Sequence, residues 1–214
     1  MKVNLEILSS AYLLGEKSID TQRIKEFVPQ MMVRRRLTTA AKIAVELLNS
    51  VEHFDGGRIV CGSAFGGLET SASILNAIKD EQPLSPTDFQ NSVYNTAVSY
   101  LSILYHNHNE IMTISSGDKT SLNVLKAGAL KALDDDILLL LCFETLNIPN
   151  IEQVNHCITY LESGVALVVK VTSEKPTLTL EKSTLVGIPN AISEMLHIAQ
   201  IAPTLERAIV EVIL

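Results

Sequence analysis

The chain has 214 residues, which is long enough for one compact domain with a substantial core. Its formal net charge of −7 argues against a nucleic-acid partner, because neutralising phosphates requires a basic face. Three scattered cysteines give neither a disulfide framework nor a zinc-ligand spacing, and no apolar run reaches membrane-spanning length. We therefore expect a cytoplasmic protein that neither spans nor binds a membrane and needs no metal or cofactor.

The first part of the chain alternates predicted strands and helices. Thr38 or Thr39 can cap the first long helix, and a stripe of Ile74, Leu75 and Ile78 is expected to be the buried face of the second. Between these helices, the glycines of GSAFGGLETS favour a tight turn over a phosphate-binding loop, because the P-loop ending is missing. The predicted elements are a strand at 3–8, a helix at 37–51, a strand at 58–65 and a helix at 69–80.

The second part continues the alternation. We expect a long helix at 87–106, a strand at 111–116, a helix at 122–133, a strand at 136–144, a helix-like segment at 154–161 and strands at 164–173 and 176–183. Residues 183–214 are predicted to be a helical tail of unknown role, outside a core of about residues 1–182. Strands that alternate with helices imply crossover connections and a mostly parallel sheet covered by helices, in the α/β class.

Few residues are candidates for chemistry. Cys61 and Cys142 lie in apolar strands, where cysteine behaves as a small buried hydrophobe and not as a nucleophile. The cluster Arg34, Arg35 and Arg36 is either a solvated approach to a helix or a set of donors to an acidic or phosphate-bearing partner.

The stretch IMTISSGDKTSL, residues 111–122, is typical of a strand that presents a nucleophile at the start of a helix. The turn contains Asp118 and no cysteine. Ser115 and Ser116 lie in the same turn, but no histidine and acid accompany them at a recognisable spacing. An active site, a remnant of one and an ordinary connection all remain open from these residues alone.

Three stretches taken together resemble the N-terminal half of the β-ketoacyl synthases, the condensing enzymes of the thiolase fold. They are RIVCGSAFGGLETS, LSPTDFQNSVYNTAVSYLSILYHNHNE and MTISSGDKTSLNVLKAGALKAL, and GVALVVK is similar to the strand that precedes the family's second half. The resemblance implies the N-terminal half of a thiolase-like fold, βαβαβαββ, with a mostly parallel five-stranded sheet. The whole of residues 1–214 would form one shortened ketosynthase-like domain.

The departures from the family narrow the expected function. Asp118 occupies the position of the family's nucleophilic cysteine, and a thioester exchange through a carboxylate would give a high-energy mixed anhydride. No catalytic residue is therefore expected. The resemblance implies a chain-length-factor type of subunit, as in type II polyketide and aryl polyene systems, which pairs with a catalytic β-ketoacyl synthase as a heterodimer or heterotetramer.

The resemblance also assigns expected contact residues. MTISS would be the interface strand, the Ser-Pro helix would line or close the partner's acyl tunnel, and Arg34–Arg36 could dock an acyl carrier protein. The packed-core alternative for the aromatic residues of that helix stays open. The expected tunnel and interface residues are Phe89, Ser92, Tyr94, Asn95, Met112, Thr113, Ser115 and Ser116.

Two other functions are compatible with the sequence. One is a stand-alone enzyme that decarboxylates or hydrolyses carrier-bound acyl units, with Ser115 or Ser116 as the hydrolytic nucleophile. The other is a homodimeric scaffold that pairs through the same strand, since an open strand edge favours some partner.

Overall fold

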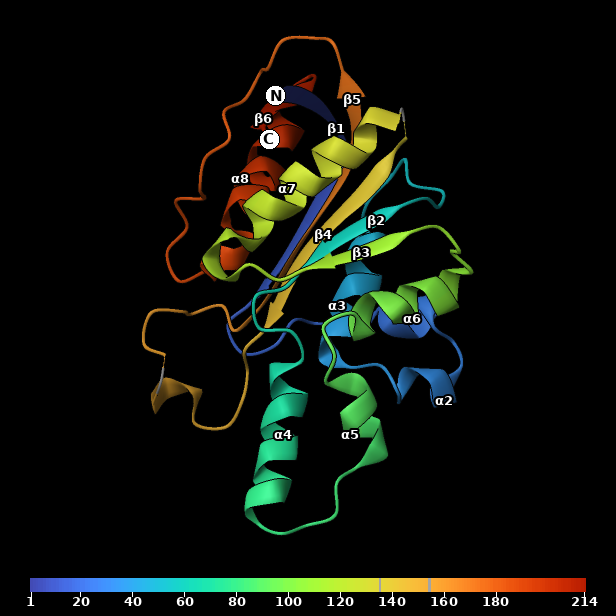
Figure 1. Ribbon diagram of the computed structural model, residues 1–214, viewed down its shortest axis with the longest axis vertical. Coiled ribbons are helices and arrows are strands. Elements are labelled where there is room, and N and C mark those ends of the chain that lie inside the picture. The colour runs from blue at the N-terminus through green and yellow to red at the C-terminus, as the bar shows by residue number, and fades with distance from the viewer. Residues whose placement is uncertain (135, 154) are drawn as a thin grey trace.

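The protein is built on one six-stranded sheet with the strand order β3-β2-β4-β5-β1-β6 (Figure 1). The structure is a computed structural model and describes residues 1–134, 136–153 and 155–214. The strands are β1 (Lys2–Gly15), β2 (Ile59–Gly62), β3 (Ile111–Ile114), β4 (Leu138–Thr145), β5 (Glu162–Thr172) and β6 (Ala208–Ile213).

The sheet is mixed, which corrects the expected mostly parallel sheet of five strands. β2 is parallel to β3 and β4, whereas β5 is antiparallel to both β4 and β1, and β1 is antiparallel to β6. The connection from β4 to β5 explains the difference, because its described residues form only the short helix η3 (Ile151–Gln153) and no crossover helix. Without a crossover helix the chain returns in the opposite direction. The α/β class itself is confirmed.

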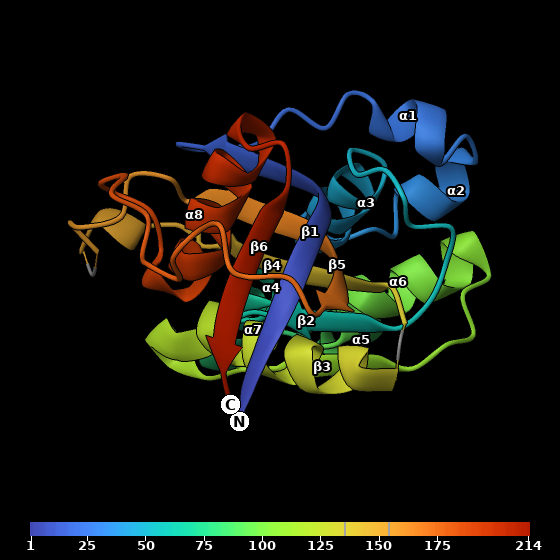
Figure 2. The ribbon, with the colours of Figure 1, turned by 90° about the horizontal axis from the view of Figure 1, so that it is seen from above.

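Helices cover both faces of this sheet (Figure 2). One face packs against α3 (Thr39–Leu48) and α6 (Thr96–Tyr105), and the other packs against α7 (Thr120–Lys131) and α8 (Ser193–Ile201). Every residue of β4 is buried. Its alternate side chains divide between the two cores, with Leu140 among α7 and α8 and Leu141 among α3 and α6, as expected for a central strand covered on both sides.

The predicted first helix is confirmed in a shorter form. Thr38 caps α3, since its Oγ1 accepts a hydrogen bond from the Ala41 N–H at 3.1 Å. Two short helices, α1 (Ile24–Phe27) and α2 (Met31–Arg34), precede it. The remaining short 3₁₀ helices are η1 (Gly117–Lys119), η2 (Ala132–Asp134), η4 (Asn190–Ile192) and η5 (Ala202–Thr204).

The C-terminal segment differs most from the expectation of a helical tail. It contains α8, which belongs to the buried core, and β6, which pairs with β1 from Lys2 to Ile7. The strand predicted at 176–183 forms only a single bridge, from Leu178 to Val210. The helix predicted at 154–161 is absent from the described residues 155–161, and Val154 lies outside the described part.

A two-helix arm projects from the end of the sheet (Figure 1). Helix α4 (Leu68–Lys79) leads out and α5 (Pro86–Asn91) leads back, and we call residues 68–91 the α4–α5 arm. The long helix predicted at 87–106 is split at residues 92–95, where α5 ends and α6 has not yet begun. The predicted buried stripe of α4 is wrong, because Leu75 is 66% and Ile78 57% exposed and Ile74 is only half-buried.

Candidate functional site

The turn after β3 is held in place by two hydrogen bonds at the start of α7. The Ser116 N–H donates to Thr120 Oγ1 at 3.1 Å, and the Thr120 hydroxyl donates to the Gly117 carbonyl at 2.7 Å. Gly117 has a φ of +53°, a left-handed conformation that glycine adopts without strain. Thr120 is fully buried at the start of α7, so the turn is anchored on the helix that follows it.

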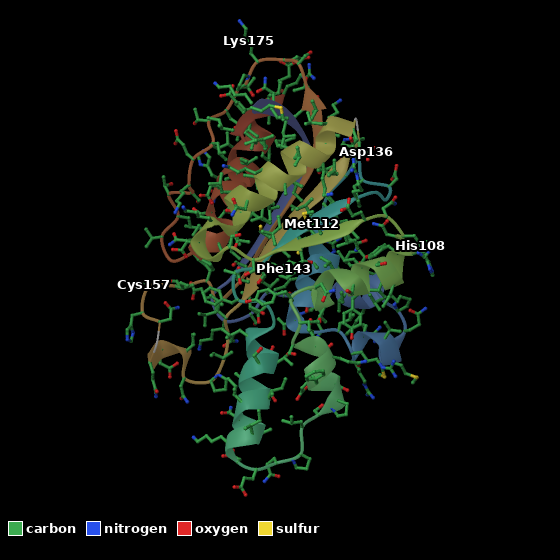
Figure 3. The ribbon with its side chains drawn as sticks, viewed as in Figure 1. His108, Met112, Asp136, Phe143, Cys157 and Lys175 are labelled. Carbon is green, nitrogen blue, oxygen red and sulfur yellow. The ribbon has the colours of Figure 1, made fainter. Side chains whose placement is uncertain are left out.

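Asp118 lies on the exposed outer side of this turn. Its Oδ2 accepts a hydrogen bond from the Asn190 side chain at 3.3 Å, which links the turn to the segment before α8. Asp118, Cys157, Lys182 and Asn190 are among the residues that line a surface cavity of about 400 Å³. Cys157, labelled in Figure 3, belongs to the exposed β4–β5 connection and was not anticipated from the sequence. A carboxylate in this position can accept hydrogen bonds but is a poor acyl carrier.

The two serines of the turn are not assembled into a catalytic triad. Ser115 Oγ donates to the Ala64 carbonyl at 3.3 Å, and Ser116 takes part through its backbone N–H. Within the described residues, no hydrogen bond joins either hydroxyl to a histidine or a carboxylate. The geometry therefore contains no base positioned to activate Ser115 or Ser116.

The other two cysteines are buried, as predicted. Cys61 on β2 and Cys142 on β4 are completely buried. Burial raises the pKa of both thiols, and the nearby Glu144 adds to the effect in each case. A raised pKa disfavours the thiolate, so neither cysteine is suited to act as a nucleophile.

Glu144, at the end of β4, is the buried carboxylate that organises the neighbouring loop. It accepts hydrogen bonds from the Ser63 hydroxyl at 3.0 Å, from the Phe65 N–H at 3.2 Å and from the Ala64 N–H. Burial raises the pKa of Glu144 to about 7, while these hydrogen bonds act in the opposite direction. Glu144 was not among the residues expected from the sequence. The signal that could have identified it is its place as the acid that ends the apolar run ILLLLCF.

The Glu144 carboxyl predicts a measurable pH dependence of stability. Because its pKa is higher in the folded chain than in the unfolded chain, the protonated carboxyl favours folding at low pH, and this contribution is lost as the pH rises through 7. A Glu144→Gln variant cannot lose a proton there. We expect the wild-type free energy of unfolding to fall by about 1 kcal/mol more than that of the variant between pH 6 and pH 8.5.

Urea unfolding of both proteins at the two pH values measures this difference. The comparison cancels the titration of groups that the two chains share. Parallel pH dependences of the two proteins would show that Glu144 does not hold its proton in the folded chain.

Tyr94 packs directly on the glycine turn that leads into the arm. Gly66 has a φ of +59°, and a Cβ added there would lie 2.9 Å from the Tyr94 ring. The Tyr94 hydroxyl donates to the Ala64 carbonyl at 3.3 Å. Gly66 is therefore needed both for its backbone conformation and for close packing against the ring.

The other residues of the expected tunnel lie on or next to the arm. Phe89 is 68% exposed, so it is not part of a packed core of this chain, and that alternative is wrong for this residue. Ser92 Oγ donates to the Phe89 carbonyl at 2.8 Å, and Asn95 is exposed at the start of α6. These side chains lie at the surface of the described chain.

Met112 and Thr113 lie on β3, an edge strand of the sheet (Figure 3). The Ser63 N–H donates to the Ile114 carbonyl at 3.2 Å and the Ile59 N–H to the Glu110 carbonyl at 3.0 Å. Residues 110, 112 and 114 therefore direct their backbone groups toward β2, and residues 111 and 113 direct theirs outward. In the described part of the chain, no strand pairs with this outer side.

The opposite edge of the sheet is partly covered. The Thr177 and Leu178 N–H groups both donate to the Ile209 carbonyl of β6, at 2.9 and 3.1 Å. Thr177 Oγ1 also accepts from the Ile209 N–H at 2.9 Å. Residues 177 and 178 thus block part of one edge of the sheet, whereas no described strand covers the outer edge of β3.

The three arginines at positions 34, 35 and 36 differ in their contacts and exposure. Arg34 donates from Nη1 to the carbonyls of Val28 and Pro29, both at 2.8 Å, so this side chain closes the preceding turn. Arg35 and Arg36 are exposed. Within the described residues, neither of these two side chains donates a hydrogen bond to a backbone carbonyl as Arg34 does.

The described residues contain no group of three or more histidine, cysteine, aspartate or glutamate side chains arranged to hold a metal ion. Asp134 and Asp136 instead form ion pairs with Arg58. None of the helices in residues 1–134, 136–153 and 155–214 is long and apolar enough to cross a membrane.

The fold and the turn after β3 define a ketosynthase-like protein of the thiolase type. A model of the β-ketoacyl synthase N-terminal domain matches residues 15–202. The chain belongs to this family. A search of curated protein sequences finds no match.

Solved structures with the same fold include ketosynthase complexes. The complex of the ketosynthase ApeO with its chain length factor ApeC from Xenorhabdus doucetiae is similar at 21% identity and a TM-score of 0.60, over 81% of this chain and 85% of that chain. The ishigamide ketosynthase/chain length factor matches at 11% identity and a TM-score of 0.63, over 81% of this chain and 63% of that one.

A third match is the AntDE:AntF complex of a type II polyketide synthase acyl-carrier protein with its ketosynthase. It has 15% identity and a TM-score of 0.56, and the match covers 80% of this chain and 64% of that chain. The TM-scores of 0.56 to 0.63 show a shared fold, and identities of 11 to 21% show nothing beyond the fold. The region in common spans less than two thirds of the matched chain in the ishigamide and AntDE:AntF structures.

Proposed function

We propose that this chain is a non-catalytic, chain-length-factor-like subunit that pairs with an active β-ketoacyl synthase and shapes its acyl tunnel. The proposed setting is type II fatty acid or polyketide biosynthesis, including aryl polyene systems, in the cytoplasm. The observation that supports the proposal is an ordered turn between β3 and α7 that exposes Asp118, the residue that the sequence resemblance aligns with the family's nucleophilic cysteine. On this proposal the chain keeps the strand and the turn for pairing and not for catalysis.

The unpaired edge of β3 supports a role in pairing. Ile111 and Thr113 direct their backbone groups outward, where a strand of a partner can continue the sheet. Exposed apolar side chains lie on both helices that flank this strand, Ile103 on α6 and Leu130 on α7. Such a surface is unfavourable in water unless a partner covers it.

Phe89 and Tyr94 are the proposed tunnel residues. A bulky side chain that enters a partner's acyl tunnel sets the length of product that fits. Phe89 is exposed on the arm and free to contact a partner, whereas Tyr94 is held on the Gly66 turn. We further propose that Arg35 and Arg36 contribute to docking an acidic carrier protein, since Arg34 is already bound to backbone carbonyls.

An activity assay separates this function from a stand-alone enzyme. The chain alone, an active ketosynthase from the same organism alone and the two together are incubated with malonyl- and acyl-loaded carrier protein. We expect no turnover by the chain alone, and a product distribution of the ketosynthase that changes when the chain is added. Turnover by the chain alone that is lost in Ser116→Ala or Asp118→Ala would establish the enzyme alternative.

A homodimeric scaffold is the second candidate, because the same open edge of β3 can pair with its own copy. The acidic net charge disfavours this arrangement, since two copies repel each other at long range. Sedimentation of the purified chain alone distinguishes a monomer from a homodimer.

A further inference from the structure

The α4–α5 arm exposes apolar side chains that its own chain leaves uncovered. Neither helix has a buried residue, and α5 is the only element of the described chain that packs extensively on α4. Leu75 and Ile78 lie three residues apart and therefore on one face of α4, and α5 and the loop before it add Phe89 and Leu84. An apolar surface of this kind on a projecting element marks a site of protein contact.

The arm is poorly supported as an isolated unit. A 12-residue helix is marginally stable in water, and packing on a six-residue helix that buries nothing adds little. Within the described residues, one side-chain hydrogen bond joins the two helices, from the Ser73 hydroxyl to Asp88 at 3.3 Å. A partner that covers the arm would supply the missing packing.

The charges of the arm indicate the chemistry of that partner. Residues 68–91 carry Glu69, Asp80, Glu81 and Asp88 against the single base Lys79. A complementary surface is apolar in the middle and has lysine or arginine at its rim. A second copy of this chain is disfavoured, because each copy carries a net charge of −7.

The arm is continuous with the open edge of β3. The Ala64 carbonyl, in the loop from which the arm leaves the sheet, accepts hydrogen bonds from Ser115 Oγ and from the Tyr94 hydroxyl, both at 3.3 Å. Ser115 directly follows β3. A subunit that pairs with β3 is thus adjacent to the base of the arm.

We infer that the α4–α5 arm packs, through Leu75 and Ile78, into an apolar groove with a basic rim on the ketosynthase subunit. This inference rests on the proposed function and adds a second contact region to it. The strand edge fixes the register of the two subunits, and the arm adds buried apolar area and a charge-dependent association rate.

The test measures the dissociation constant of the complex between the full chain and an active, cysteine-bearing ketosynthase from the same organism. We expect Leu75→Ser combined with Ile78→Ser to raise the dissociation constant by roughly tenfold or more. The matched control Asn76→Ser changes an exposed polar residue of the same helix and should leave it within about twofold. Thermal unfolding of the free chain should be nearly the same in all three proteins, because the altered side chains are exposed.

Two further measurements test the contact between the α4–α5 arm and the ketosynthase. Amide hydrogens of α4 should exchange more slowly in the complex than in the free chain. Association should weaken with added salt, and Asp80→Ser combined with Glu81→Ser should reduce that dependence.

The outcomes separate this inference from the proposed function. If the apolar double variant binds as tightly as the wild type while Thr113→Pro does not bind, the arm inference is wrong and the function stands. If the wild-type chain does not bind the ketosynthase, both are wrong. If the double variant instead disrupts a homodimer of this chain, the arm binds a second copy, which overturns the choice of partner.

Discussion

Thr113→Pro is expected to abolish stable pairing with the ketosynthase while leaving the fold of the chain nearly unchanged. Thr113 directs its backbone N–H away from β2, so proline removes a donor from the open edge without removing a bond of the β2–β3 pair. In a complex, the partner's acceptor opposite it would be buried without a donor. The combined loss is about 2–4 kcal/mol, or roughly 30- to 1000-fold in the dissociation constant.

Thr113→Val is the matched control, because it keeps the N–H and the β-branched shape of the side chain. It should bind within a few-fold of the wild type. Isothermal titration with the ketosynthase measures both affinities, and thermal unfolding checks the fold. Unchanged binding by the proline variant would place the interface away from β3.

Deleting residues 183–214 is expected to prevent cooperative folding. The deletion removes α8 and β6, and β6 is the neighbour of β1 from Lys2 to Ile7. Each buried Leu, Ile, Val or Met side chain contributes about 1.5–3 kcal/mol, so the combined loss is as large as the total stability of a typical domain, about 5–15 kcal/mol. The core side chains that are lost include Ile192, Met195, Leu196, Ile198, Val210 and Val212.

Far-UV circular dichroism with thermal unfolding measures this effect. The full chain should show one cooperative transition, and the shortened chain should show none. A deletion variant that unfolds cooperatively near the same temperature would mean that residues 1–182 form an independent core, as the sequence alone suggested.

The sequence was most informative where local chemistry decides the structure. Thr38 caps α3 because a threonine precedes an apolar helical pattern, and the turn around Asp118 follows from a β-branched run, small residues and a helix. The burial of Cys61 and Cys142 follows from their apolar strands. Each of these features depends on a few neighbouring residues.

Features that depend on distant partners were not predictable in the same way. The periodicity of α4 correctly marks an apolar face, but it does not say what covers that face, and Leu75 and Ile78 lie at the surface of the described chain. The direction of β5 depends on the connection before it, and β6 belongs to the sheet only because it pairs with β1. Glu144 was missed because its hydrogen-bond donors, in residues 63–65, lie far away in the sequence.

Pairing with a catalytic subunit is tested by the mass and composition of the complex between this chain and a cysteine-bearing ketosynthase from the same organism. Analytical ultracentrifugation of the two purified proteins, mixed in equal amounts, gives both quantities. The account predicts one species that contains the two chains in equal number, as a heterodimer or a pair of heterodimers. Separate sedimentation of the two proteins at micromolar concentration would contradict it.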